Sequence, residues 1–404
     1  SGQNGPLARA GGGLMSLRSA CPVSGSTEIT PVFTLGNVPV ICNQLWPDAE
    51  AATAAPAGDV ALVRSAGCGM IWNAAFEPER MVYAPGYENA LHFSPKFRAF
   101  ADGLAQGLVD RFDLRGKHVF EIGCGDGHML DLMVKHGAAT ATGFDPSMAG
   151  IDSPFTAREG VEIVPEYFRS DQLDRPFDAI MCRHVLEHLD APMALLHDIR
   201  RAIGTRDVPV YFEVPNAGWM LRAVSMWDVI YEHVGYWTAP AMETAFRRAG
   251  FAPVSMREGY DGQFLMLEAR PTAPAPDHLP SDTANVIADA DAFTTAAEGE
   301  LAIWRKRLSE MSGKAVIWGA GSKGITFANA LGSTAAASLA ALVDLNPRKH
   351  GLFAPGVALP VVAPEALRDL QPDLVLISNA LYEAEITAEI RGLGLDPEFA
   401  VVAG

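Results

Sequence analysis

A glycine-rich segment, E-I-G-C-G-D-G at positions 121–127, has the clearest chemical content in the chain. It follows an apolar run and precedes a helix-like run, so it predicts a tight turn from a buried strand into a helix. Glycines in such a turn let the backbone approach a small ligand, and an acidic side chain about 20 positions later can bind ribose hydroxyls. Asp145, followed by Pro146, has that position. The two features together predict a site for a nucleotide or for a cofactor that contains a nucleoside.

The order of the acid and the glycines separates two kinds of ligand. A dinucleotide fingerprint reads G-x-G-x-x-G with its third glycine inside the helix, whereas here Glu121 precedes G-x-G-x-G and the helix begins at His128. This order resembles motif I of class I methyltransferases. The resemblance implies that the glycines pass under the methionyl part of S-adenosylmethionine and that Asp145 binds the ribose; a turn without a ligand is the alternative. The predicted cofactor-binding residues here are Glu121, Gly123, Gly125, Asp126, Gly127, Asp145 and Pro146.

A second polar cluster, R-H-V-L-E-H-L at positions 183–189, follows the strand predicted to end near Cys182. Its side chains should lie at the carboxyl edge of the sheet, where ligands bind in open α/β folds. His184 and His188 are four positions apart, as in some metal sites, but the pattern is not H-E-x-x-H. The segment resembles the post-motif of many class I methyltransferases, which lines the cofactor and substrate cleft. We therefore expect His184 to contact the cofactor, and we expect no metal ion here.

The third cluster, Tyr231-Glu232-His233, stands in an apolar stretch that follows a strand predicted over 209–215. It supplies a base with potential orienting partners. Methylation at carbon requires such a base, because the carbon nucleophile forms only after a proton next to a carbonyl is removed. Transfer to oxygen or nitrogen can depend mainly on positioning. A histidine held by structural hydrogen bonds is the alternative interpretation of His233.

A second glycine loop, Gly319-x-Gly321-x-x-Gly324, is followed by Asp344 and matches the dinucleotide pattern better than the first loop does. It allows binding of NAD, but the unit spans only about 90 residues and shows few later strands. A phosphate-binding loop for the substrate and a purely structural turn are the alternatives. Lys323 in the loop and the basic segment 348–350 place positive charge at its mouth, so Lys323 and Asp344 are candidates for substrate binding.

The pattern between Met81 and Glu268 alternates strands and helices, which predicts a parallel sheet with helices on both faces. Strands are expected at 117–122, 141–145, 177–182 and 209–215, and helices at 92–112, 128–136 and 192–203. A Pro-rich connector at 271–280 leads to a long helix at 281–311 and to further strands at 315–318, 341–344 and 373–378. The fold class is thus α/β, with a Rossmann-like domain, a smaller Rossmann-like C-terminal domain and a small irregular N-terminal module.

These elements predict five parts of the chain. Residues 1–13 are an expression remnant or a disordered lead-in, 14–80 form the N-terminal module, and 81–270 form the S-adenosylmethionine-binding domain. Residues 271–312 are the linker and long helix, and 313–404 form the C-terminal domain.

Composition limits the partners. The formal net charge is -17 and the pI is about 5.0, which disfavours nucleic acid as a partner. The five cysteines are odd in number and scattered, so we expect reduced thiols and a cytoplasmic protein rather than a disulfide framework. The apolar runs are shorter than the roughly 18 residues that a membrane helix needs, and we expect no membrane partner. A small-molecule substrate is the remaining expectation.

The combined motifs resemble the three-domain sugar C-methyltransferases from about Cys21 to Val402, including the element D-L-N-P-R-K-H-G at 344–351. The resemblance implies transfer of a methyl group to C3 of a nucleotide-linked 4-keto-deoxysugar through an enolate, with the C-terminal domain holding the sugar nucleotide. The implied site residues are the base His233 with Tyr231 and Glu232 beside it, His188 near the substrate, and Tyr87 closing the pocket.

Two departures from that family limit the transfer of its properties. The N-terminal module of the family binds zinc through two C-x-x-C pairs, whereas serines replace one cysteine of each pair in the segments 21–24 and 65–68. Serine is a poor zinc ligand, so we expect no structural zinc. The family also commonly has Tyr-His-Glu-His where this chain has Tyr231-Glu232-His233, and Gly-Gly-Ser where it has Y-D-G-Q-F-L at 260–265. We therefore extend the expected acceptor to other small biosynthetic intermediates.

Overall fold

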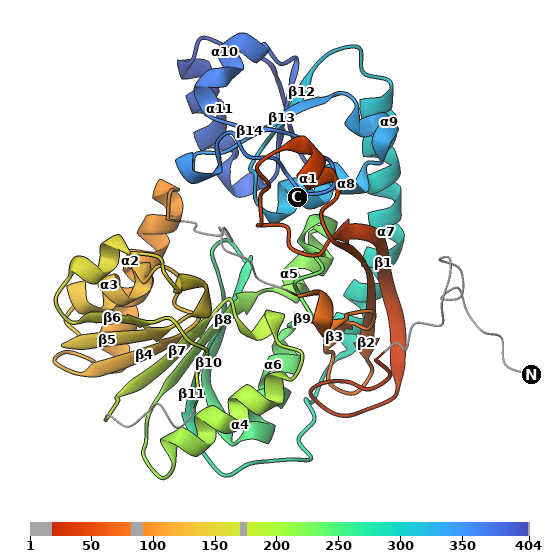
Figure 1. Ribbon diagram of the computed structural model, residues 1–404. Coiled ribbons are helices and arrows are strands. Elements are labelled where there is room, and N and C mark those ends of the chain that lie inside the picture. Colours follow the sequence, from red (N-terminus) through yellow and green to blue (C-terminus); the bar gives the residue numbers. More distant parts are fainter. Residues whose placement is uncertain (1–17, 82–91, 170–175, 403–404) are drawn as a thin grey trace, which may run out of the picture.

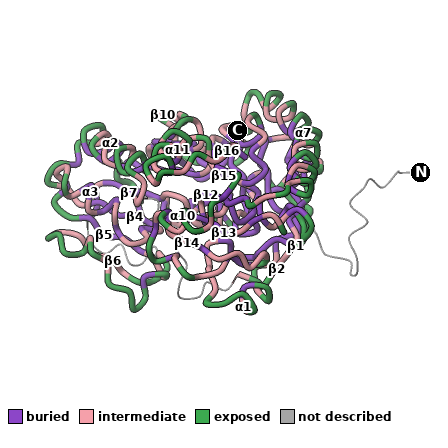
Figure 2. Tube along the Cα trace, turned by 90° about the horizontal axis from the view of Figure 1, so that it is seen from above, coloured by how far each residue is buried: buried purple, intermediate pink, exposed green. Residues whose placement is uncertain are grey.

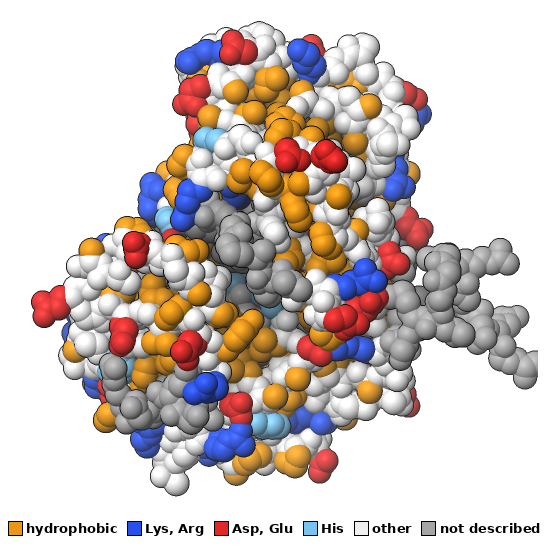
Figure 3. All heavy atoms as spheres, viewed as in Figure 1, with side chains coloured by type: hydrophobic (Ala, Val, Ile, Leu, Met, Phe, Trp, Pro, Cys, Tyr) orange, Lys and Arg blue, Asp and Glu red, His pale blue; other side chains and the backbone are white. Residues whose placement is uncertain are grey.

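The computed structural model describes residues 18–81, 92–169 and 176–402, which form three packed parts (Figure 1). Tyr87, predicted to close the substrate pocket, lies outside these residues. Among them, no helix combines the length and the apolar character needed to cross a lipid bilayer. Acidic and basic side chains are mixed over the face in Figure 3, and this face is hollowed between the central and C-terminal parts.

The central part is a seven-stranded sheet in the order β10-β11-β8-β7-β4-β5-β6. Its five parallel strands are β4 (His118–Ile122), β5 (Thr140–Phe144), β6 (Val161–Val164), β7 (Ala179–Arg183) and β8 (Val210–Pro215). The antiparallel hairpin of β10 (Phe251–Gly259) and β11 (Phe264–Pro271) extends the sheet beyond β8. The predicted order of strands and helices in this part is confirmed, and the hairpin adds to it.

Helices cover both faces of this sheet, as predicted (Figure 1). Successive residues of a strand point to opposite faces. On β4, Val119 packs with α2 (Pro95–Arg111) and α3 (His128–Lys135), whereas Phe120 packs with α4 (Pro192–Ile203) and α6 (Ala239–Ala249). The strands are therefore buried on both sides, which explains why they read as continuous apolar runs.

The structure corrects the expectation of an irregular N-terminal module. Its strands β1 (Ile29–Pro39), β2 (Ala57–Ser65) and β3 (Ile71–Asn73) form an antiparallel sheet. The short helix α1 (Ala49–Thr53), between β1 and β2, lies against the C-terminal part, where the carbonyl oxygen of Ala52 accepts a hydrogen bond from the N–H of Gly356 (Figure 1). The fourth strand, β9 (Gly235–Tyr236), comes from the segment that follows the Tyr-Glu-His cluster. The boundary expected near residue 80 is thus not a structural one, because the module is completed by the central part of the chain.

The C-terminal part contains five parallel strands in the order β14-β13-β12-β15-β16, more than its sequence pattern predicted. Its strands are β12 (Ala315–Trp318), β13 (Leu339–Val343), β14 (Val361–Val362), β15 (Leu374–Ile377) and β16 (Glu398–Val401). Its helices are α8 (Ser322–Ala330), α9 (Ser333–Ala336), α10 (Leu367–Leu370) and α11 (Glu383–Gly392).

One apolar core joins the N-terminal module, the long helix α7 (Ala284–Ser309) and the C-terminal sheet. Phe33 of β1 meets Phe293 of α7 edge to face, with ring centroids 5.5 Å apart. The short helix α5 (Ala217–Arg222) of the central part also contributes to this core. The buried strands of the C-terminal part lie inside a rim of more exposed helices (Figure 2). The C-terminal part is therefore attached by buried apolar surface on the side of α7.

Candidate functional site

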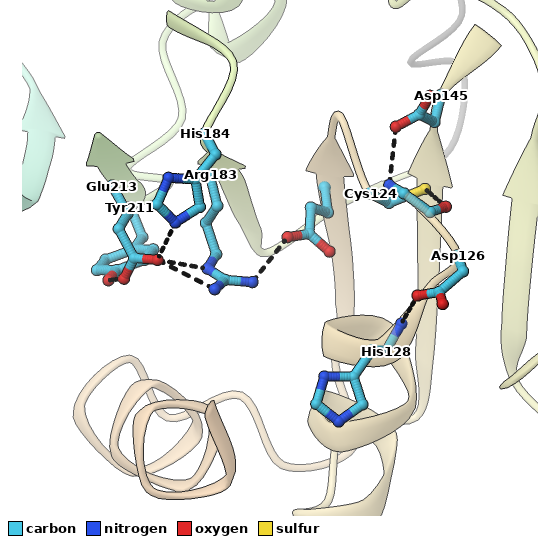
Figure 4. A network of polar contacts seen from close by, with 10 residues as sticks. Cys124, Asp126, His128, Asp145, Arg183, His184, Tyr211 and Glu213 are labelled. Atoms are coloured by element: carbon cyan, nitrogen blue, oxygen red, sulfur yellow. Dashed lines mark hydrogen bonds and ion pairs between the residues drawn. The ribbon is translucent and has the colours of Figure 1, made fainter. Parts of the chain in front are cut away.

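The first glycine loop connects β4 to α3 and is tied to the end of β5. The backbone N–H of Gly125 donates a hydrogen bond to Oδ2 of Asp145, over 2.8 Å, while Oδ1 of Asp145 accepts from the N–H of Ser147 (Figure 4). Gly125 has φ +52°, and a Cβ on Gly123 would lie 2.0 Å from a methyl group of Val185. The loop therefore needs glycine for its backbone path and its close packing. Its geometry places the predicted acid beside the glycine turn.

A small aromatic cluster lies beside this loop and was not predicted. Nε2 of His92 lies 3.6 Å from Oδ2 of Asp126, and the His92 ring lies 5.0 Å from that of His128 and 5.4 Å from that of Phe155, between centroids. Burial lowers the pKa of His128 to about 4, so its ring is neutral at pH 7. Flat rings next to a glycine loop can cover the face of a nucleobase. The residues come from three separate segments, so no local pattern in the sequence indicated the cluster.

Glu121, predicted to bind the cofactor, lies beneath the loop instead. It is 1% exposed, and its Oε1 lies 3.7 Å from Nη1 of Arg183. Burial raises the pKa of Glu121 to about 7, against the opposing effect of Arg183. The contact of Glu121 with the cofactor stays a prediction, and in this structure its carboxylate lies beside Arg183 at the ends of β4 and β7.

Arg183 and His184 converge on the buried carboxylate of Glu213 at the ends of β7 and β8 (Figure 4). Oε1 of Glu213 lies 3.0 Å from both Nη2 of Arg183 and Nε2 of His184, and its Oε2 accepts from the hydroxyl of Tyr211 over 2.7 Å. Although burial opposes protonation, the carboxylates of Glu187 and Glu213 raise the pKa of His184 to about 9. His184 therefore carries a positive charge at pH 7 on the wall of the cavity described below.

The two remaining predicted histidines meet at the same edge of the sheet. Nδ1 of His188 lies 3.0 Å from the carbonyl oxygen of Glu232, so this nitrogen carries a proton and donates a hydrogen bond to that oxygen. The ring of His233 lies 5.0 Å from that of His188, between centroids. Burial, and then the charge of His188, lower the pKa of His233 to about 3. His233 is therefore neutral at pH 7.

Glu187, His188 and His233 each place one potential metal-ligand atom within 4.8 Å of the others. This set differs from the His184 and His188 pair that the spacing suggested. Nδ1 of His184 instead lies 3.7 Å from Oε1 of Glu187. His188 and His233 are 45 positions apart in the sequence. The fold thus brings the two predicted polar clusters together.

Tyr231, predicted beside the base, points away from His233 into the N-terminal module. Its ring packs on Phe76 at 5.5 Å between centroids, and its hydroxyl accepts a hydrogen bond from the N–H of Glu77 over 3.0 Å. Glu232 is also fully buried, and its Oε1 accepts from the N–H of Cys42 over 2.5 Å. The placement of Tyr231 therefore argues against contact with a substrate, whereas Glu232 and His233 both border the cavity.

The cavity has a volume of about 370 Å³ and lies between the carboxyl ends of the two parallel sheets. Its central-domain wall contains His184, Glu187, His188, Asn216 and Phe264, and its C-terminal wall contains Gly319, Lys323, Asp344, Ser378 and Asn379. Binding between domains at strand ends is typical of small-molecule sites. The structure thus brings the predicted substrate residues His188, Lys323 and Asp344 to the same cavity.

Most of the positive charge near the second glycine loop is already engaged. Oδ2 of Asp344 accepts from the N–H of Ala320 and lies 3.2 Å from Nζ of Lys349, which is buried. Nζ of Lys323 lies 2.5 Å from Oδ2 of Asp228 and 5.1 Å from the centroid of the Trp219 ring. The expectation of a basic mouth therefore needs correction: Lys349 stabilises the loop from inside, and Lys323 faces the cavity within an ion pair.

The β10–β11 turn also reaches the C-terminal part, which the sequence did not predict. The side-chain amides of Gln263 and Asn379 exchange two hydrogen bonds, and the hydroxyls of Tyr260 and Tyr382 are hydrogen-bonded to each other. All four residues border the cavity. These contacts close the cavity on the side opposite the apolar attachment.

Of the four cysteines that bind zinc in the resembling family, this chain keeps Cys21 and Cys68, whose Sγ atoms are 3.6 Å apart. Cys42 lies elsewhere, with its Sγ 3.8 Å from Oγ1 of Thr326. Two thiols are too few for a tetrahedral structural site.

Two family models match this chain. Residues 97–256 match the model described as "Methyltransferase domain", and residues 296–394 match the model described as "C-methyltransferase C-terminal domain". Together with the sheet order, the glycine loop and Asp145, the first match identifies the central part as a class I S-adenosylmethionine-dependent methyltransferase domain.

Individual relatives match about a quarter of this chain. The ubiquinone biosynthesis O-methyltransferase of Coxiella burnetii (strain Dugway 5J108-111) is 34% identical over 94 residues, which cover 22% of this chain and 40% of that protein. The tRNA U34 carboxymethyltransferase of Campylobacter concisus is 29% identical over 109 residues, covering 24% and 36%. The chain thus spans about two fifths of the length of these relatives. A solved S-adenosylmethionine-dependent methyltransferase from Mesorhizobium loti has a TM-score of 0.35 at 18% identity, covering 42% of this chain and 99% of its own.

Proposed function

We propose that this protein is an S-adenosylmethionine-dependent C-methyltransferase that acts on a nucleotide-linked keto-deoxysugar or a similar small biosynthetic intermediate. The observation that carries the proposal is the neutral ring of His233 on the wall of a cavity between two Rossmann-like sheets. The match of residues 296–394 to a C-methyltransferase C-terminal domain supports methylation at carbon.

The residues that hold the cofactor in this proposal are those of the first glycine loop and the end of β5: Gly123, Gly125, Asp126, Gly127, Asp145 and Pro146. The fixed carboxylate of Asp145 suits a ribose diol, and the path of the loop leaves room for a ligand beside Gly125, where a Cβ would meet no atom within 4 Å. S-Adenosylmethionine supplies an electrophilic methyl group on a positively charged sulfur. His184 borders the cavity next to this loop and is the proposed link between the two ligand positions.

In the proposed reaction, His233 removes a proton from the carbon next to the acceptor carbonyl. The electron pair of the broken C–H bond would form an enolate on the acceptor, which is the carbon nucleophile that a bound methyl donor requires. His184, cationic at pH 7, stabilises the negative charge that develops on the acceptor, because the two histidines border one cavity.

The other groups have supporting roles in this proposal. Glu232 accepts a hydrogen bond from the N–H of Cys42 and fixes the backbone next to His233. Its own carbonyl oxygen fixes the ring of His188, which leaves Nε2 of His188 to contact the substrate. Lys323 and Asp344 form part of the wall on the C-terminal side, where we place the nucleotide of the substrate.

Transfer to oxygen or nitrogen is the second candidate, and the similarity of the central domain to ubiquinone biosynthesis O-methyltransferases favours it. An enzyme of that kind would depend on positioning more than on a base. A third candidate, an NAD-dependent oxidoreductase or a nucleotide-binding scaffold, would use the loop from Gly319 to Gly324. Titration with NAD and with S-adenosylhomocysteine separates the third candidate from the others, since it requires NAD to bind.

The test of the proposed function is methyl transfer to a panel of nucleotide-linked 4-keto-deoxysugars by the wild type and by His233→Asn. We expect the substitution to abolish turnover while calorimetric binding of S-adenosylhomocysteine is unchanged. The matched control is His197→Asn on the exposed face of α4, which should retain full activity. A modest effect of His233→Asn would favour the second candidate.

A further inference from the structure

We propose that Cys21 and Cys68 form an oxidisable dithiol site, which a hydroperoxide converts into a disulfide that links the segment before β1 to the β2–β3 turn. The proposal does not depend on the methyltransferase reaction, because the site lies outside the cavity described above. It rests on the placement of two sulfur atoms from distant parts of the sequence.

The distance between the two Sγ atoms is 3.6 Å, and the two residues are 47 positions apart. A disulfide requires about 2.05 Å, so the sulfur atoms must approach by roughly 1.5 Å. Rotation of the two side chains with a small backbone shift can provide this movement. Cys21 and Cys68 are thus the pair of cysteines that the described residues bring into contact.

Both cysteines stand in turns that hold their backbones in place. The N–H of Gly25 donates to the carbonyl oxygen of Cys21, and the N–H of Cys21 donates to that of Ser26, both over 2.9 Å. On the other side, the N–H of Ser65 donates to the carbonyl oxygen of Met70 across the turn that contains Cys68. The two sulfur atoms therefore face each other from anchored positions, which lowers the entropy lost when they are joined.

The surroundings of Cys21 favour its thiolate. The hydrogen bond from Cys68, and additional ones from Ser24, lower the pKa of Cys21 against the effect of burial. The N–H of Ser24 lies 3.4 Å from Sγ of Cys21. The other buried cysteines have the opposite tendency, since burial raises the pKa of Cys42, Cys124 and Cys182. Because Cys21 and Cys68 are the described cysteines whose Sγ atoms lie in contact, oxidation should join this pair.

Access favours a small oxidant. Cys21 is 3% exposed and Cys68 is fully buried, whereas Ser19, Ala20 and Gly25, which flank Cys21 in sequence, are exposed. A hydroperoxide can reach such a site more easily than a bulky disulfide reagent. The reaction begins when the Cys21 thiolate attacks one peroxide oxygen and the O–O bond breaks. Hydroxide is the leaving group, and Cys21 becomes a sulfenic acid.

The second step uses the neighbouring thiol. Sγ of Cys68 attacks Sγ of Cys21, the S–O bond breaks, and water leaves with the Cys68 proton. Overall, two thiols and one hydrogen peroxide give one disulfide and two waters. The link closes a loop across most of the N-terminal sheet, so it should raise the melting temperature of the protein.

The experiment treats the folded full-length protein with one equivalent of hydrogen peroxide and measures its intact mass and its peptides without reduction. We expect the loss of two hydrogen masses, a peptide that links Cys21 to Cys68, and a higher melting temperature that a thiol reductant reverses. Cys21→Ser and Cys68→Ser should each abolish the mass loss, whereas the control Cys182→Ser should retain it.

Three outcomes would overturn the proposal: no change of mass with excess peroxide, oxygen addition without a linked peptide, or a linked peptide between other cysteines. If a serine variant fails to fold, peptide mapping of the wild type still decides among these outcomes. Activity in methyl transfer is not a readout here, so failure of the methyltransferase proposal leaves this test unaffected.

Discussion

The side-chain amides of Gln263 and Asn379 exchange two hydrogen bonds, 3.0 and 2.9 Å long, between the β10–β11 turn and the C-terminal part. The backbone carbonyl of Gln263 also accepts from the N–H of Asn216 at the cavity wall. On the opposite side of the cavity, a continuous apolar core attaches the same C-terminal part to α7 and the N-terminal module. The C-terminal part is thus held by polar contacts at the β10–β11 turn and by a buried apolar core at α7.

We expect Gln263→Ala to raise KM for the acceptor about 30-fold, because two hydrogen bonds worth roughly 1 kcal/mol each are lost from the closed form. Binding of S-adenosylhomocysteine should be unchanged. Steady-state kinetics of Gln263→Ala, Asn379→Ala and the double variant provide the measurement. The double variant should lose no more than either single one, and fully additive losses would show that the two amides act separately.

Asp145→Ala should weaken binding of S-adenosylhomocysteine by at least about tenfold, because a hydrogen bond to a charged group contributes roughly 1.5–3 kcal/mol. The loss also frees the N–H of Gly125 and loosens the loop. Isothermal titration calorimetry provides the measurement, with the exposed Asp152→Ala as the matched control. Equal affinity of Asp145→Ala and wild type for S-adenosylhomocysteine would contradict the placement of the cofactor at this loop.

Tyr231→Phe separates a structural from a catalytic role of that tyrosine. Its hydroxyl accepts a hydrogen bond from Glu77 in the N-terminal module, so we expect a loss of about 1 kcal/mol in the free energy of unfolding and little change in kcat. Urea denaturation and initial rates measure the two quantities. A large fall in kcat with unchanged stability would instead place Tyr231 in the reaction.

His184 should make stability depend on pH. Its pKa is raised from 6.5 to about 9 in the folded protein, so its contribution to stability is fully present below pH 6.5 and is lost as the pH rises through 9. The free energy of unfolding should therefore fall over this interval by more in the wild type than in His184→Gln. Urea denaturation at a series of pH values measures it, and parallel curves for the two proteins would contradict the assigned charge.

Local patterns predicted the central sheet well, because Val119 and Phe120 pack on opposite faces of a strand that reads as one apolar run. The contact of Gly125 with Asp145 also follows from the order of neighbouring parallel strands. Contacts between distant segments were not predictable in this way. Gln263 and Asn379 are 116 positions apart, and β9 pairs with β3 across a far longer stretch of chain than a hairpin spans.

The same reason explains why Tyr231 does not lie beside the ring of His233, where the sequence placed it. Its spacing put it next to His233, but the pairing of β9 with β3 turns this segment toward the N-terminal module and buries the tyrosine against Phe76. The sequence also suggested a free basic segment at 348–350. In the structure, Nζ of Lys349 instead contacts Asp344 and the carbonyl oxygen of Ala320 inside the loop. The sequence therefore predicted which residue types the site contains better than it predicted where their side chains point.

The most direct test of the account is the position of the transferred methyl group, measured by NMR with S-adenosylmethionine labelled with carbon-13 in its methyl group and an acceptor from the 4-keto-deoxysugar panel. We predict a methyl group bound to carbon. We also predict that solvent deuterium exchanges into the C–H position next to the acceptor carbonyl in the wild type, and that this exchange is at least about 100-fold slower in His233→Asn. A methyl group bound to oxygen or nitrogen, or exchange that is unaffected by His233→Asn, would contradict it.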